Sequence, residues 1–111
     1  MIKIFAVSLV GFTEVLLVTY LFHSTAVTTA SLAVASLCLV WLVGFKKHVL
    51  LTFVSSAVGG FFAEAIVVSN GAWTYHSQHL FGLPIWLLFL WGSAGVAIGF
   101  LMRELELACY N

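Results

Sequence analysis

The stretch "IFAVSLVGFTEVLLVTYLF", residues Ile4–Phe22, carries one acidic or basic side chain, Glu14, in a mostly apolar run. A helix needs about 20 such residues to cross roughly 30 Å of hydrocarbon. Further runs of this kind follow at Ala26–Phe45, Val49–Ser69 and Pro84–Met102. None alternates between apolar and polar residues as the strands of a membrane barrel do. The sequence therefore predicts an all-α integral membrane protein, a four-transmembrane-helix bundle forming one domain over residues 1–111.

Composition leads to the same class. The 111 residues are 63% hydrophobic and 7% charged, with a mean hydropathy of +1.17, whereas a soluble domain carries about 25% charged residues. We therefore expect the lipid bilayer to be the solvent. The net charge is zero, so nucleic acid is not an expected partner. The first run also fits the outline of a signal peptide, but its length and Glu14 favour a retained helix.

The basic residues predict an orientation. They lie before the first run, between the second and third, and after the fourth, at Lys3, Lys46, Lys47 and Arg103. With four spans, all these positions face one side, and the positive-inside rule places both termini in the cytoplasm. Aromatic residues of the opposite side, Trp73, Tyr75 and Trp86, suit an interfacial belt.

A weak internal similarity appears at an offset of 50 residues. Phe12, Glu14, Val18 and Trp41 recur as Phe62, Glu64, Val68 and Trp91. This pattern fits a parallel duplication of a two-helix unit. Chance similarity between aromatic-rich apolar helices is the alternative.

Two carboxylates, Glu14 and Glu64, are the main candidates for function. At 1.5 Å per residue, both lie between the midplane and the outer face. A charge there costs about 2.5–3.5 kcal/mol and usually faces a partner or a cavity. Each is therefore either a neutral hydrogen-bond donor between helices or a functional group. We expect Glu64 to be the more constrained, because Ala57 and Gly60 share its face.

The loop after Glu64 predicts a pocket. Glu64 would form its floor, and Trp73, Tyr75 and His76 its rim. This pocket would bind a partner side chain or a lipid headgroup, or it would transfer a proton.

Histidines in and near that loop allow the hypothesis of a metal site. His76 and His79 are three residues apart, and His23 could approach them from the neighbouring turn. With Glu64 they would offer nitrogen and oxygen ligands for zinc, copper or iron. Interfacial histidines bonded to water and headgroups are the favoured alternative, so no metal or other cofactor is predicted. Cys38 and Cys109 lie at different heights, and no disulfide is expected between them.

Small residues predict helix packing in the fourth run. Gly92, Gly95 and Gly99 form a stripe that includes a GxxxG motif. Small residues let helix backbones approach closely in membranes. The stripe is expected to contact another helix, either within the subunit or on another chain.

Two families share features with the sequence. Glu64, Gly71, Trp73, Tyr75, Gly82, Pro84 and Trp91 form a pattern, E-x6-G-x-W-x-Y-x6-G-x-P-x6-W. It resembles the integral-membrane carotenoid hydratases of the bisanhydrobacterioruberin type, which carry Tyr at the Trp73 position and are about twice as long. The resemblance implies a carotenoid or related polyene as ligand and Glu64 as its proton donor.

The overall size and Glu14 in "TEV" also resemble the small multidrug resistance transporters. That resemblance implies Glu14 as the carboxylate that exchanges protons for a cationic drug. The Gly/Trp pattern of that family is not found in the third run, and Glu64 is additional.

The favoured reading is an accessory or structural subunit of a larger membrane complex, in a homo- or hetero-oligomer. Nothing in the sequence assembles a self-sufficient catalytic set, so an enzyme is the less favoured class. The carotenoid-type enzyme and the drug transporter are the alternatives.

Overall fold

A computed structural model of the chain describes residues 2–71, 75 and 83–110. Its helices are α1 (Ile2–Leu21), α2 (Thr25–Val43), α3 (Lys47–Ser69) and α4 (Leu87–Tyr110). All of them are long and apolar enough to cross a membrane. Within these described residues, the predicted all-α architecture is confirmed, with four helices of the length and composition that an integral membrane protein requires.

Two short turns join the first three helices. Ser24 caps α2, since its side-chain oxygen accepts a hydrogen bond from the Val27 N–H at 3.4 Å. Gly44 ends α2 with a φ of 125°, in a region that glycine tolerates and other residues rarely adopt. The second helix was expected to reach Phe45, but this glycine ends it at Val43.

The fourth helix differs from its prediction at both ends. It was expected over Pro84–Met102 but runs over Leu87–Tyr110. The buried Pro84 precedes it, and the Pro84 carbonyl accepts a hydrogen bond from the Leu87 N–H at 3.3 Å. Past Arg103, strong helix formers extend α4 for two further turns.

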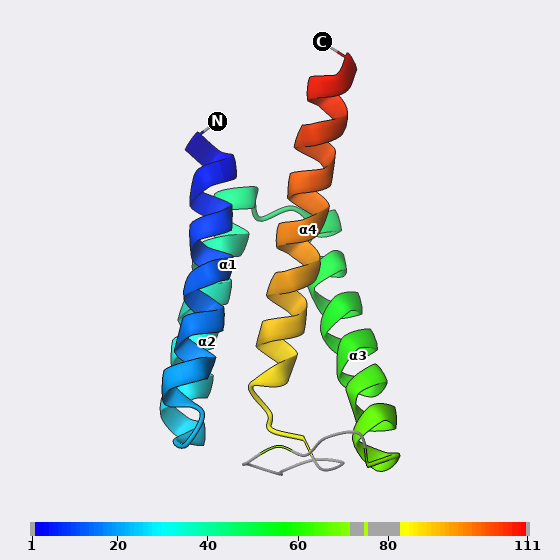
Figure 1. Ribbon diagram of the computed structural model, residues 1–111. Helices are drawn as coiled ribbons and strands as arrows, with labels where there is room; N and C mark the ends of the chain where they lie inside the picture. Colours follow the sequence, from blue (N-terminus) through cyan, green and yellow to red (C-terminus); the bar gives the residue numbers. More distant parts are fainter. Residues whose placement is uncertain (1, 72–74, 76–82, 111) are drawn as a thin grey trace.

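The helices run alternately up and down, so both termini and the α2–α3 turn lie at one end of the bundle (Figure 1). The α1 helix packs on α2, and α3 packs on α4. The α4 helix also contacts α1 and α2, whereas the backbones of α1 and α3 do not approach each other closely in the described part of the chain. The basic residues Lys3, Lys46, Lys47 and Arg103 thus gather at the end that holds the termini.

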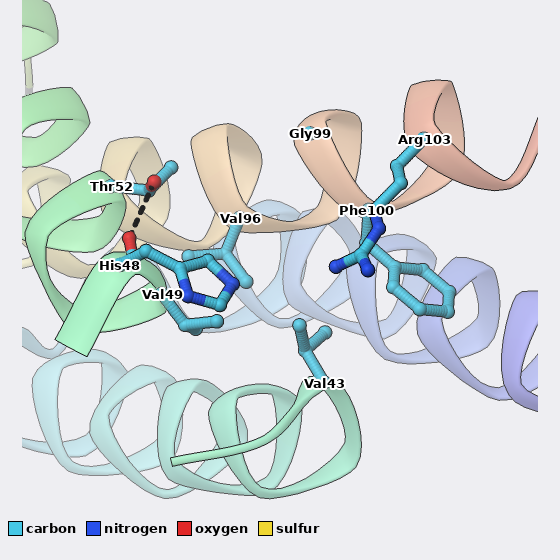
Figure 2. Close-up of a pocket in the computed structure, with 8 residues that line it drawn as sticks. All are labelled: Val43, His48, Val49, Thr52, Val96, Gly99, Phe100 and Arg103. Atoms are coloured by element: carbon cyan, nitrogen blue, oxygen red, sulfur yellow. Dashed lines mark hydrogen bonds between the residues drawn. The ribbon is translucent and has the colours of Figure 1, made fainter. Parts of the chain in front are cut away.

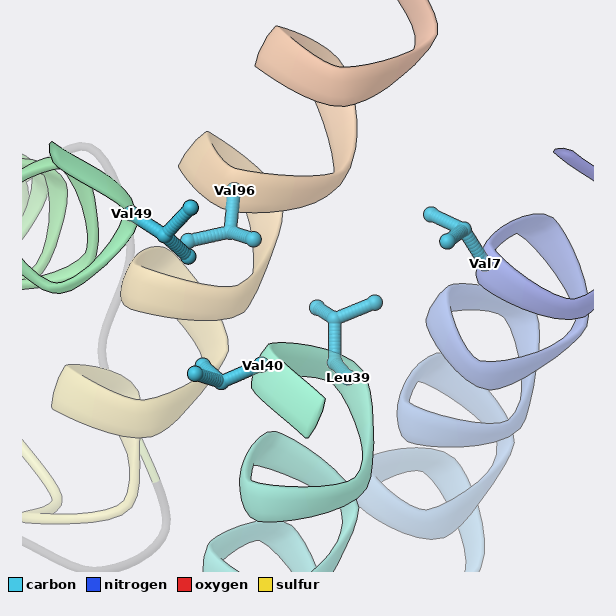
Figure 3. Packing of buried hydrophobic residues seen from close by; sticks show 5 residues of the cluster. All are labelled: Val7, Leu39, Val40, Val49 and Val96. Atoms are coloured by element: carbon cyan, nitrogen blue, oxygen red, sulfur yellow. The ribbon is translucent and has the colours of Figure 1, made fainter. Parts of the chain in front are cut away.

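Two apolar clusters hold the helices together. The first lies toward the end with the termini and takes side chains from all four helices, Val7, Leu39, Val40, Val49 and Val96 (Figure 3). The second lies toward the other end and contains Leu32, Phe61, Leu83, Trp86 and Leu87. Between these clusters, α1, α2 and α4 place a layer of polar side chains.

Candidate functional site

A buried polar layer crosses the middle of the bundle. It consists of Glu14 on α1, Ser36 on α2 and Ser93 on α4, which are 1%, 4% and 2% exposed. Each comes from a stretch that has apolar core residues on both sides, such as Leu32 and Leu39 around Ser36. The carboxyl group is therefore enclosed by protein rather than turned toward lipid.

Hydrogen bonds join the members of this layer. The Ser36 hydroxyl donates to Oε1 of Glu14 at 3.4 Å, a long contact, and lies 2.8 Å from the Ser93 hydroxyl. A hydroxyl has one proton to donate. When Ser36 donates to Glu14, Ser93 must be the donor to Ser36. The Phe89 carbonyl, 3.5 Å from the Ser36 hydroxyl, is a further acceptor for the Ser36 proton, so the layer forms one hydrogen-bonded cluster in which both serines have partners.

Sequence reasoning identified Glu14 but missed Ser36 and Ser93. Serine hydroxyls commonly form hydrogen bonds between membrane helices. The usable signal was a small number of serines within apolar helices, Ser31 and Ser36 in the second helix and Ser93 in the fourth. Which of them meets Glu14 depends on the helix arrangement, which the sequence pattern did not provide.

Glu64 has a different environment, because it is only partly buried. Its Oε2 accepts a hydrogen bond from the Tyr75 hydroxyl at 2.7 Å, and the Tyr75 ring meets the Trp86 ring edge-on. The structure thus brings together Glu64 and Tyr75 of the predicted pocket. Trp73 and His76 lie outside the described residues.

Glycines of α4 pack tightly against α3. A Cβ added at Gly92 would lie 2.6 Å from the Phe53 ring, and one at Gly95 would lie 1.8 Å from the Ser56 hydroxyl. A Cβ at Gly99 would meet nothing within 4 Å. Gly92 and Gly95 are thus contacts within the chain, and Gly99 borders open space. On α3, Gly60 makes room for the indole of Trp91 in the same way.

A lateral groove opens between α2 and α3. It encloses about 280 Å³ and is lined by Ala33, Ser36, Leu37, Val40, Phe45, Leu50, Phe53 and Phe89. Apart from Ser36, every lining side chain is apolar. Ser36 therefore connects this α2–α3 groove to the polar layer behind it.

The metal hypothesis rests mainly on residues outside the described part of the chain, since His76 and His79 lie there. His23 is exposed at the end of α1, and its ring lies 3.9 Å from that of Phe22. Within residues 2–71, 75 and 83–110, no group of three His, Cys, Asp or Glu side chains could hold a metal ion. Cys38 and Cys109 are free thiols.

The described residues thus offer two carboxyl groups in different environments and one apolar groove. The polar layer provides a carboxyl group with hydroxyl partners inside the bundle, and the Glu64–Tyr75 pair provides one near the end opposite the termini. The groove provides an apolar surface open to the membrane. No family model matches the chain, and no curated protein or solved structure matches it either.

Proposed function

We propose that the chain is an accessory or structural subunit of a larger membrane complex, and that a partner's transmembrane helix occupies the α2–α3 groove. The groove itself is the observation that carries this proposal. Helices α2 and α3 follow each other in sequence yet touch only sparsely, so aromatic and aliphatic side chains remain uncovered between them. Membrane helices associate largely through van der Waals packing, which such a surface can supply.

A photo-crosslinking residue tests the groove. Leu37 lines it and is 61% exposed, while Leu9 on α1 is 53% exposed but lies outside it. We expect a crosslinker at Leu37, in native membranes, to give one discrete protein adduct, and the matched one at Leu9 to give lipid labelling. Mass spectrometry of the adduct identifies the partner, including a second copy of this chain. Equal lipid labelling from both positions would refute the subunit proposal.

The subunit proposal includes an orientation with both termini in the cytoplasm. The basic end of the bundle supports it through the positive-inside rule. In a Cys38→Ala background, we expect Asn70→Cys to react with an impermeant thiol reagent in intact cells. The native Cys109, at the opposite end, should react only after permeabilisation. The reverse pattern would place the basic end outside.

We infer a second candidate function, a membrane enzyme that hydrates an isoprenoid or carotenoid lipid. The Glu64–Tyr75 hydrogen bond supports it, together with the resemblance carried by Glu64, Gly71 and Pro84. A protonated Glu64 would add its proton to a polyene double bond, and water would add to the resulting cation and return a proton to Glu64. Tyr75 would stabilise the carboxylate formed, and the Tyr75 and Trp86 rings would stabilise the cation.

Replacing Glu64 by glutamine tests this chemistry. Gln keeps the size and the hydrogen-bond acceptor but cannot transfer the proton, so Glu64→Gln should lower hydration of an added polyene by about 100-fold or more. The conversion is followed by absorbance, and circular dichroism checks that the helices persist. Unchanged conversion by this variant, or no conversion by the wild type, would contradict the hypothesis of a membrane hydratase.

A further inference from the structure

A second cavity lies at the basic end of the bundle, between the first turns of α3 and the second half of α4. It encloses about 170 Å³, and its lining includes His48, Val49, Thr52, Val96, Gly99 and Arg103. Figure 2 shows Val43, His48 and Arg103 extending from three helices toward the same space. None of the functions proposed above uses this basic-end pocket.

The basic-end pocket has an apolar inner wall and a polar rim. Val49 and Val96 are buried and belong to the first apolar cluster, so the inner wall is apolar. Arg103 and His48 supply nitrogen donors at the rim, where both residues are exposed. The Thr52 hydroxyl donates to the His48 carbonyl at 2.8 Å, so it is already engaged. An amphiphile with a polar acceptor and an apolar body matches this division.

The positive charges around the basic-end pocket favour an anionic ligand. Among the described residues, Arg103 forms no ion pair, although Glu104 and Glu106 follow it on the same helix. Lys46 and Lys47 stand beside the pocket at the start of α3. A guanidinium binds phosphate through paired N–H donors. The cavity volume of about 170 Å³ leaves room for one phosphate group.

We propose that the basic-end pocket binds the phosphate of an anionic phospholipid. Arg103 binds the phosphate oxygens, His48 donates a further hydrogen bond, and an acyl chain leaves along the exposed apolar sides of α3 and α4. Basic pockets between membrane helices recognise lipid headgroups in this way. The site lies at the depth of the headgroups, because it adjoins the last turn of α2 and the first turn of α3.

Lipid retention tests this proposal. The full chain, purified in a neutral detergent, is titrated separately with phosphatidylglycerol, phosphatidylcholine and inorganic phosphate, and native mass spectrometry counts the bound molecules. We expect one phosphatidylglycerol to be retained in preference to phosphatidylcholine. Arg103→Gln should weaken this binding by about tenfold or more, because it removes the charge-assisted hydrogen bonds from the guanidinium to the phosphate.

Two further variants separate the site from general attraction. Lys47→Gln removes the same charge from the same end but outside the pocket, and should bind like the wild type. Gly99→Leu adds a side chain at the pocket border, where a Cβ meets no atom within 4 Å, and should block binding without disturbing the helices. It decides the question if Arg103→Gln does not fold.

Three results would overturn the proposal. Equal weakening by Lys47→Gln and Arg103→Gln would show diffuse attraction to the basic end. Wild-type binding by both Arg103→Gln and Gly99→Leu would place the lipid elsewhere. Displacement of the lipid by inorganic phosphate at equal concentration would identify a site for free phosphate.

Discussion

Gly95→Leu is expected to separate α3 from α4 and prevent the bundle from folding. A Cβ at this position would lie 1.8 Å from the Oγ and 2.3 Å from the Cβ of Ser56. Rotation of the Ser56 side chain can move its hydroxyl, but its Cβ is fixed by the α3 backbone. The helices must therefore move apart, which also breaks the close packing of Gly92 on Phe53. Overpacking usually costs about 1–3 kcal/mol and sometimes more, and we expect at least about 3 kcal/mol here.

Gly99→Leu is the matched control for this effect. It places the same side chain one turn further along α4, where a Cβ has no neighbour within 4 Å. We expect its free energy of unfolding, measured by titrating micelles with a denaturing detergent, to stay within about 0.5 kcal/mol of the wild type, as surface changes usually do. Similar stabilities for Gly95→Leu and Gly99→Leu would contradict the α3–α4 packing described above.

The sequence was sufficient to predict the helices because membrane insertion depends on local composition. An apolar run of about 20 residues has few alternatives in lipid, where a helix satisfies its own backbone. The boundaries were less predictable, because they depend on individual backbone conformations. Gly44 ends α2 two residues early, and the turn that begins at the buried Pro84 delays α4 until Leu87.

The candidate site was less predictable than the helices, because it depends on contacts between distant residues. Ala57 and Gly60 suggested close packing around Glu64, yet Gly60 accommodates Trp91 and Glu64 is only partly buried. Glu14 instead lies 1% exposed among hydroxyl groups. Ser36 and Ser93 are 22 and 79 residues away from Glu14 in sequence, and no local sequence pattern predicts that these side chains meet. The two carboxylates related by the proposed duplication thus differ in environment.

Glu14→Ala is expected to be strongly destabilising, because it removes a side chain enclosed by three helices. The lost atoms leave a cavity, and cavities in packed cores typically cost about 2–5 kcal/mol. Ser36 also loses its carboxyl partner, although it keeps Ser93. Glu64→Ala serves as the control, since Glu64 is partly exposed, and its loss should be clearly smaller in the same denaturing-detergent titration. Equal losses at both positions would show that the polar layer does not hold the bundle together.

Glu14→Gln then separates a structural role from proton exchange. The amide keeps the size of the carboxyl group and an oxygen that can accept the Ser36 proton, so we expect its stability to remain within about 1 kcal/mol of the wild type. In the subunit reading, the crosslink from Leu37 should also persist. In the transporter reading, an intact and stable Glu14→Gln chain should lose proton-driven export of a cationic dye from vesicles, because an amide cannot release a proton. If a correctly folded chain exports the dye only when Glu14 is present, the transporter hypothesis replaces the subunit proposal. If Glu14→Gln instead lowers the stability, the polar layer needs the carboxyl group itself.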